Sequence, residues 1–264
     1  MSGTAEVAER VDQVRERIAA ACSGAGRSPS SVILIAVTKT HPPKAARAAV
    51  EAGIADLGEN RVEELVAKAP RVEGARWHLV GQLQRRKARD VIGRQILVHG
   101  LDRRSLADTL SRRSSDAGTI QRVLVQVNVG DDPRKGGCQV DHALDLVAYA
   151  RDLPHLTVEG LMTVPPLPDA ATDPNEAARP HFATLRALRD DARTRFAEVA
   201  HLSMGMSADL EAAVAEGATM VRIGSAIFGE RGAGPWLAPQ DDPHAEAPST
   251  TPTAAAVVDT EEHR

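Results

Sequence analysis

A lysine that follows a short apolar run is the residue of this sequence best placed to do chemistry. Lys39 stands two residues after the run VILIAV, residues 32–37, which is rich in β-branched side chains. Such a run, bounded by serine and proline, is typical of a strand buried on both faces of a parallel sheet. Ligands gather at the carboxyl ends of such strands, so the Lys39 amine is expected to face a binding site. The alternative is a strand-end lysine that extends its ammonium group into water.

Two segments near the end of the sequence have the composition of anion-binding turns. Gly224 and Ser225 follow a predicted strand. Ser203 and Ser207 flank Gly205 in the unit before it. At the start of a helix the backbone N–H groups are unpaired and the helix dipole favours an anion, while glycine lets an oxyanion approach the chain. Either segment alone is better explained by an ordinary helix cap or tight turn. Both together, in the last two units of a barrel, favour a phosphate site.

A lysine that faces a phosphate site predicts a phosphorylated aldehyde held as an imine. Burial among apolar groups disfavours an ammonium, so a half-buried lysine readily supplies the neutral amine that attacks an aldehyde. Pyridoxal 5′-phosphate (PLP) is the commonest ligand of this kind. His78 also ends a predicted strand, but it has no second histidine or carboxylate at ligand spacing. A packed or hydrogen-bonding histidine is therefore favoured there over a metal ligand, and no metal site is predicted.

Eight units, each a short apolar segment followed by a helix, must position these residues. Alternating strands and helices predict a parallel sheet with right-handed crossovers, and eight units close a (β/α)8 TIM-type barrel. An open doubly wound sheet is the alternative, although no GxGxxG pattern follows the first strand. The predicted strands are 32–37, 54–58, 76–80, 96–99, 122–129, 157–162, 199–202 and 220–223. The helices that follow them are predicted to end near residues 52, 69, 92, 114, 153, 196 and 216, with a short last helix after Ser225.

The chain is predicted to form one barrel domain, residues 1–231, with additions at both ends. Residues 4–24 carry apolar side chains at three- and four-residue steps, which predicts an extra amphipathic helix outside the barrel. Residues 232–264 are rich in proline, alanine, threonine and acidic residues without periodicity, which predicts a disordered tail.

Composition narrows the class of partner. The 264 residues have a net charge of −4 and a sequence pI near 6.1, so no attraction to nucleic acid or anionic membrane is expected. Aromatic residues make up 2% of the chain, too few for a surface that stacks nucleic-acid bases. Two widely separated cysteines, no signal-peptide pattern and no membrane-length apolar segment predict a cytoplasmic protein with reduced thiols.

Four segments carry a resemblance to a known family: AVTKTHPPK, DLGENRVEE, WHLVGQLQRRK and HLSMGMSADLEAAVAEGATMVRIGSAIFGER. They resemble the pyridoxal phosphate homeostasis proteins, whose fold is similar to the barrel domain of alanine racemase. The resemblance runs from the first helix to Arg231. It implies that Lys39 carries PLP as a Schiff base, that SMGMS together with Gly224 and Ser225 binds the phosphate, that Arg222 faces the pyridine nitrogen, and that Asn60 lies near the ring.

The predicted cofactor-binding residues are Lys39, Asn60, His78, Ser203, Met204, Ser207, Arg222, Gly224 and Ser225. Thr38 replaces a serine found in many relatives, and Ser225 replaces a threonine. Both substitutions keep a hydroxyl group. Lys44, Lys87 or Lys135 as the holder of a second PLP molecule stays an open alternative.

The predicted position of Arg222 also bears on mechanism. An arginine only donates hydrogen bonds, so a pyridine nitrogen beside it stays unprotonated and the ring is a weak electron sink. This disfavours transaminases and decarboxylases. Relatives of alanine racemase take a second base, a tyrosine, from an added β-domain; here the only tyrosine, Tyr149, falls on a predicted helix.

The leading hypothesis is therefore a monomeric PLP-binding protein without a catalytic cycle, which buffers the cofactor and delivers it to apo forms of PLP-dependent enzymes, and so affects amino-acid and keto-acid balance. The alternatives are a slow amino-acid racemase, a lyase acting on a phosphorylated aldehyde, and a regulatory partner of another protein.

Overall fold

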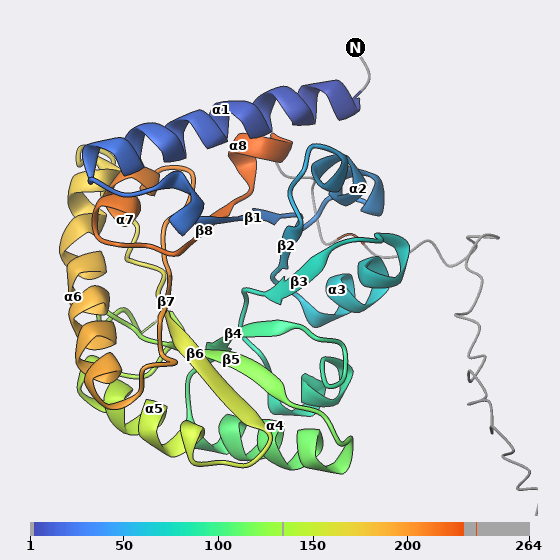
Figure 1. The fold of residues 1–264 in the computed structure, drawn as a ribbon, viewed down its shortest axis with the longest axis vertical. Coiled ribbons are helices and arrows are strands. Elements are labelled where there is room, and N and C mark those ends of the chain that lie inside the picture. Colours follow the sequence, from blue (N-terminus) through green and yellow to red (C-terminus); the bar gives the residue numbers. More distant parts are fainter. Residues whose placement is uncertain (1–2, 134, 230–235, 237–264) are drawn as a thin grey trace, which may run out of the picture.

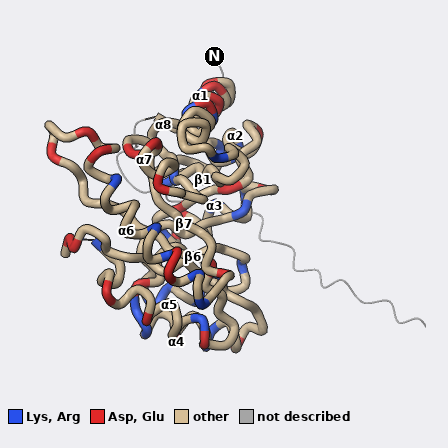
Figure 2. Tube along the Cα trace, turned by 60° about the vertical axis from the view of Figure 1, so that its left-hand side comes forward, with Lys and Arg blue, Asp and Glu red and all other residues tan. Residues whose placement is uncertain are grey.

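The computed structural model describes residues 3–133, 135–229 and 236. The predicted tail, residues 232–264, therefore lies outside the described residues except for Trp236. No helix of the described part has an apolar stretch long enough to cross a membrane. Lysine and arginine alternate with aspartate and glutamate along the chain trace, without segregation of the two signs (Figure 2).

Eight parallel strands pair in chain order and close into a barrel, which confirms the predicted (β/α)8 architecture (Figure 1). Closure is made by β8 against β1, with Ile33 paired to Met220 and Ala36 to Ile223. This pairing excludes the open-sheet alternative. The strands are β1 (Ile33–Val37), β2 (Asp56–Glu59), β3 (Arg76–Leu79), β4 (Leu97–Leu101), β5 (Gln121–Gln126), β6 (Leu156–Met162), β7 (His201–Ser203) and β8 (Met220–Ile223).

Helices cover the outside of the barrel. They are α1 (Gly3–Gly24), α2 (Pro43–Glu51), α3 (Val62–Lys68), α4 (Arg104–Asp116), α5 (Ala143–Arg151), α6 (Pro174–Arg195), α7 (Leu210–Ala215) and α8 (Ser225–Phe228). The extra N-terminal helix is α1, which packs across α2, α7 and α8 (Figure 1). Its predicted apolar stripe is its packing face, since Val11, Val14 and Ile18 are all buried.

The third unit differs from the prediction of a helix that ends near residue 92. It contains a six-residue 3-10 helix, Arg85–Asp90, in which only Ala88 is buried. Three successive cationic residues, Arg85, Arg86 and Lys87, leave this segment without the apolar stripe that would hold a longer α-helix against the barrel. Short 3-10 segments are common connectors in such places.

The barrel interior combines a small apolar layer with buried polar groups. Five residues form the apolar layer: Ile35, Leu97, Leu124, Met162 and Met220. The strands also bury polar side chains, including those of His78, His99, Ser203 and Arg222. Buried polar groups are costly unless they are hydrogen-bonded, so these side chains must be paired with one another or with a ligand.

Replacing Gly160 on β6 by alanine should destabilise the barrel. An added Cβ would lie 2.1 Å from the backbone oxygen of His201 on the neighbouring strand, and a backbone atom cannot move aside without disturbing the sheet. Overpacking of this kind costs about 1–3 kcal/mol of unfolding free energy, measurable by urea denaturation. Gly24→Ala is the control, because a Cβ there meets nothing within 4 Å. Equal stability of the two variants would contradict the prediction.

Candidate functional site

A cavity of about 320 Å³ opens at the carboxyl ends of the strands. It joins the first unit of the barrel to the last two, which is where the sequence places the amine and the anion-binding turns. Its walls are formed by Val37, Lys39, His41, Asn60, Val80, Val164, Met206, Ser207, Ala208, Arg222, Gly224, Ser225 and Gly229.

Six of the nine sequence-predicted residues line this cavity: Lys39, Asn60, Ser207, Arg222, Gly224 and Ser225. The other three do not. Met204 is fully buried in the apolar core, Ser203 is fully buried behind Arg222, and His78 lies deeper in the barrel interior. The sequence pattern marks strand ends but not the direction in which each side chain points, so it could not separate these two groups.

Sequence reasoning also missed several wall residues. His41 and Met206 line the cavity, and both lie beside predicted residues in segments already singled out, THPP and SMGMS. Their position in those segments is the signal that could have identified them. Val80 and Val164, which each follow a strand, supply apolar walls.

The two predicted anion-binding turns meet in the structure. The Ser225 hydroxyl lies 3.4 Å from the Ser207 hydroxyl, so units seven and eight present their hydroxyl groups at one place. Gly205 in the seventh turn has φ +96°, and a Cβ there would lie 2.5 Å from the Cβ of Ala213. The turn therefore requires glycine at this position.

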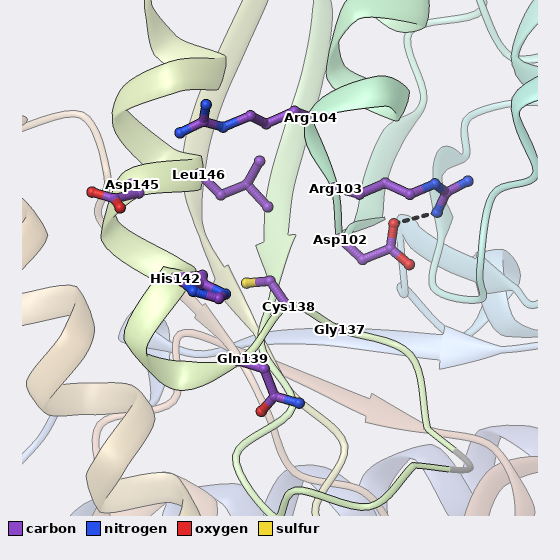
Figure 3. Close-up of a pocket in the computed structure, with 9 residues that line it drawn as sticks. All are labelled: Asp102, Arg103, Arg104, Gly137, Cys138, Gln139, His142, Asp145 and Leu146. Atoms are coloured by element: carbon purple, nitrogen blue, oxygen red, sulfur yellow. Dashed lines mark hydrogen bonds and ion pairs between the residues drawn. The ribbon is translucent and has the colours of Figure 1, made fainter.

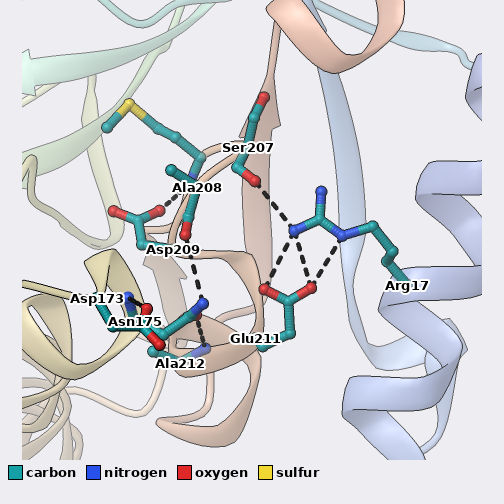
Figure 4. A network of polar contacts seen from close by, with 9 residues as sticks. Arg17, Asp173, Asn175, Ser207, Ala208, Asp209, Glu211 and Ala212 are labelled. Carbon is teal, nitrogen blue, oxygen red and sulfur yellow. Dashed lines mark hydrogen bonds and ion pairs between the residues drawn. The ribbon is translucent and has the colours of Figure 1, made fainter.

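The turn at residues 204–209 is held from outside the barrel (Figure 4). Arg17 of α1 donates one hydrogen bond to the Ser207 backbone oxygen at 3.0 Å and pairs with both carboxylate oxygens of Glu211. The Asp209 carboxylate accepts from the Met206 backbone N–H at 2.5 Å. A side chain from α1 and one from within the turn thus fix the backbone that carries Ser207.

A buried charge cluster holds the residues on both sides of Lys39. Lys68 donates to the Thr38 backbone oxygen at 2.9 Å, to Glu59 at 2.7 Å and to Glu64 at 2.9 Å. Glu59 also accepts from the Thr38 hydroxyl at 2.5 Å, and Glu64 accepts from the Thr40 backbone N–H at 2.8 Å. Thr40 has φ +67°, a conformation that a threonine adopts only when its surroundings impose it.

This cluster places two carboxylates and one ammonium group away from water. The side chains of Lys68 and Glu59 are fully buried, and that of Glu64 is 2% exposed. Burial raises the pKa of Glu59, and the charge and hydrogen bond of Lys68 act against that rise. Lys68 is the cation that both carboxylates contact, and its removal would leave buried charge unpaired.

A second polar network lies directly behind the cavity. Arg222 donates through Nη1 to the Ser203 hydroxyl at 2.7 Å and through Nη2 to the Thr163 backbone oxygen at 2.8 Å. Burial lowers the pKa of Arg222 to about 10, with Asp209 opposing the shift, so the guanidinium is still charged at neutral pH. Two anchored nitrogens fix the plane of the guanidinium group.

The network continues from Ser203 through the barrel interior. The Ser203 hydroxyl lies 2.9 Å from Nδ1 of His99, and Nε2 of His99 lies 3.0 Å from Nδ1 of His78. Nε2 of His78 lies 3.0 Å from the carboxylate of Asp56, which also pairs with Arg76. Burial acts to raise the pKa of Asp56. Hydrogen bonds from His78 and Arg76 outweigh that effect and lower this pKa to about 2.

A larger hollow, about 570 Å³, lies between the start of α4 and α5 (Figure 3). It holds none of the predicted site residues and no lysine lines it. Its one thiol, Cys138, is not a nucleophile at neutral pH because burial raises its pKa to about 12. Within the described residues, no group of three potential ligands could hold a metal ion.

The three lysines named from the sequence as possible holders of a second PLP molecule lie outside the cavity that contains Lys39. Lys44 is exposed on α2, and Lys87 pairs with Glu63. Lys135 donates to the Pro165 backbone oxygen. None of the three is among the cavity's wall residues, and Lys39 is the lysine that lies in its wall together with Ser207, Gly224 and Ser225.

Comparison with known proteins defines the class of this barrel. A family model described as the alanine racemase N-terminal domain matches residues 10–232. That span contains all eight strands and every wall residue of the cavity. The fold and the site thus define a barrel of the alanine racemase N-terminal type.

Relatives place the chain more narrowly. The pyridoxal phosphate homeostasis protein of Aquifex aeolicus is 41% identical over 226 residues, which cover 84% of this chain and 97% of that protein. The Escherichia coli protein of the same name is 38% identical over 231 residues, covering 86% and 97%. The chain belongs to the pyridoxal phosphate homeostasis protein family, as its motifs predict. The structure of PipY from Synechococcus elongatus with PLP bound matches with a TM-score of 0.72 and 32% identity, covering 84% of this chain and 100% of PipY.

Replacing Lys68 by methionine should destabilise the protein strongly. The change keeps the aliphatic stem but leaves Glu59 and Glu64 without their cation, which costs about 3–5 kcal/mol of unfolding free energy. Lys87→Met is the matched control, because its pair with Glu63 is partly exposed and worth no more than about 1 kcal/mol. Similar denaturation midpoints for the two variants would show that the buried cluster carries no special stability.

The ionised Asp56 carboxylate should stabilise the folded protein, and this stabilisation should be lost in acid. Its folded pKa of about 2 lies below the ordinary aspartate value of 3.8, so its contribution to stability is present above pH 3.8 and is lost as the pH falls toward 2. The loss amounts to about 2 kcal/mol at most. The difference in unfolding free energy between the wild type and Asp56→Asn should therefore shrink from pH 5 to pH 2. A pH-independent difference would rule out this carboxylate as its source.

Proposed function

We propose that this protein binds PLP covalently at Lys39 and acts as a carrier that stores the cofactor and releases it to apoenzymes. The observation that carries the proposal is the shared cavity, in which an amine faces two anion-binding turns and a buried guanidinium. The family name of the relatives and the PLP-bound structure of PipY support the same ligand.

The wall residues fit the parts of PLP. Ser207, Gly224 and Ser225 would hold the 5′-phosphate, because hydroxyl groups and backbone N–H groups are good phosphate donors. Arg222 would donate to the ring nitrogen, and Asn60 would lie beside the ring. A Cβ at position 224 would lie 3.3 Å from the Val37 backbone oxygen, so glycine leaves space for a ligand at this part of the cavity wall.

Lys39 would bind the cofactor through a reversible condensation. Its neutral Nζ attacks the aldehyde carbon, a C=N bond forms, and one water molecule leaves. Attack by water would reverse the reaction and free the aldehyde, whereas attack by another amine would free Lys39 and leave PLP as an imine of that amine. Lys68, Glu59 and Glu64 would keep the Lys39 backbone in place through Thr38 and Thr40 during both steps.

The same residues favour holding the cofactor over amino-acid chemistry. Bound PLP supplies a conjugated ring that accepts negative charge from an attached carbon, most effectively when its nitrogen is protonated. Arg222 can only donate, so it would keep that nitrogen unprotonated. The single tyrosine of the sequence, Tyr149, lies on α5 with its hydroxyl bonded to Asp108 at 2.5 Å, and it does not line the cavity.

Wild-type protein incubated with PLP should turn yellow, and borohydride should fix the cofactor to the peptide that contains Lys39. Lys39→Ala should lose both properties, because the amine that forms the C=N bond is gone. Lys44→Ala is the control, since Lys44 is an exposed lysine outside the cavity. A colourless wild type, or equal labelling of Lys39→Ala, would overturn the proposal. The measurements are visible absorbance and peptide mass spectrometry.

Carrier function is tested separately by transfer. Loaded protein should restore activity to an apo-transaminase even when a trap for free PLP is present, because release would occur to the acceptor. Transfer abolished by the trap would contradict direct delivery. Loss of optical activity from L-amino acids faster than with free PLP would favour the racemase alternative.

A further inference from the structure

We propose that Asp56, His78, His99 and Ser203 form a hydrogen-bond relay through the barrel interior that positions Arg222 for the ring nitrogen of PLP. The proposal rests on the proposed function, since it assigns Arg222 to that nitrogen. In this relay the four residues are positioning residues, because they act on the cofactor only through the guanidinium group.

The relay is continuous and shielded from water. It crosses the barrel from Asp56, the first residue of β2, to Arg222 near the end of β8, through side chains of β3, β4 and β7. Its three links between Ser203 and Asp56 measure 2.9, 3.0 and 3.0 Å. The four relay residues and Arg222 are each at most 7% exposed.

The chemistry of the two ends gives the relay a direction. Arg222 only donates, so the Ser203 hydroxyl oxygen must accept from it. Asp56 is ionised at neutral pH and only accepts, so Nε2 of His78 must carry a proton. The protons on the remaining three ring nitrogens are then restricted by the requirement that each contact has one donor and one acceptor.

Three arrangements satisfy that requirement. In the first, both imidazoles are neutral with the proton on Nε2: Ser203 donates to His99, His99 donates to His78, and His78 donates to Asp56. In the second, His99 donates from Nδ1 to Ser203 and accepts from His78, which must then be a cation with both nitrogens protonated. In the third, His99 is the cation and donates from both nitrogens, which its complete burial disfavours because burial lowers its pKa. The first uses the Ser203 proton in the relay and adds no buried charge, so it is the resting arrangement.

In this arrangement every hydrogen bond points from Arg222 toward Asp56. The negative charge of Asp56 therefore determines which nitrogen of each histidine carries the proton, and through them the orientation of the Ser203 hydroxyl. Ser203 and the Thr163 backbone oxygen anchor the two terminal nitrogens of Arg222. The guanidinium plane is thereby fixed where it borders the cavity.

The first test uses the protein without PLP. Long-range ¹⁵N NMR should show His78 and His99 as neutral rings protonated on Nε2 at pH 7. A His99 ring protonated on Nδ1, or a cationic His78, would overturn the proposed direction. Because no cofactor is present, this result is independent of whether the proposed function is correct.

The second test compares PLP with 1-deazapyridoxal 5′-phosphate, in which a C–H group replaces the ring nitrogen. Ser203→Ala and His99→Phe should weaken binding of PLP about tenfold, the value of one charge-assisted hydrogen bond, and leave binding of the deaza analogue within about twofold. Ser203→Thr should restore PLP binding because it keeps the hydroxyl. His201→Gln is the control: this histidine lies on β7 but bonds to Thr219 and not to the relay.

The outcomes separate the two proposals. Equal weakening for both ligands would mean that the variants damage the cavity in general, and unchanged PLP affinity would mean that the relay does not position Arg222; either overturns the relay. A wild type that binds neither ligand would instead reject PLP binding itself.

Discussion

Pairing of β8 with β1 is the constraint on which the site depends. Lys39 and Gly224 are separated by most of the sequence, and only barrel closure places the ends of their strands side by side. Parallel pairing, with Ala36 of β1 opposite Ile223 of β8, then brings an amine, a guanidinium and two serine hydroxyls to one cavity. The site is therefore a product of topology first and of local motifs second, as is usual for barrels of this class.

Buried charge supports the cavity from two sides. The Lys68 cluster fixes the backbone that carries Lys39, and the network from Arg222 to Asp56 fixes the opposite wall. Neither network reaches the ligand space with its own charged groups, apart from Arg222. Burial of ions and polar groups costs folding free energy. In this protein the buried groups orient neighbouring residues that line the cavity.

The fold and the cavity were largely predictable, because a strand-end lysine and glycine-serine turns leave local patterns. The supporting networks were not. Contact between His78 and His99 depends on the register of β3 against β4, and the contact of Lys68 with Thr38 depends on how α3 packs. Side-chain direction at a strand end was equally hidden, which is why Ser203, Met204 and His78 were predicted at the cavity but lie behind it. The helix predicted to end near residue 92 did not form because three successive cations stand at 85–87 in place of an apolar stripe, and the segment folds as a 3-10 helix.

The position of α1 has a consequence for how the chain reaches this fold. α1 is made before every other element of the described barrel, yet much of its apolar side is covered by α7 and α8, which are made about two hundred residues later. Until then only the part of that side that packs on α2 can find its native partner, and full docking of α1 must wait until β8 has closed the barrel. Assembly of this protein is thus governed by contacts between its two chain halves, a pattern associated with slow folding and with a need for protection of the nascent polypeptide.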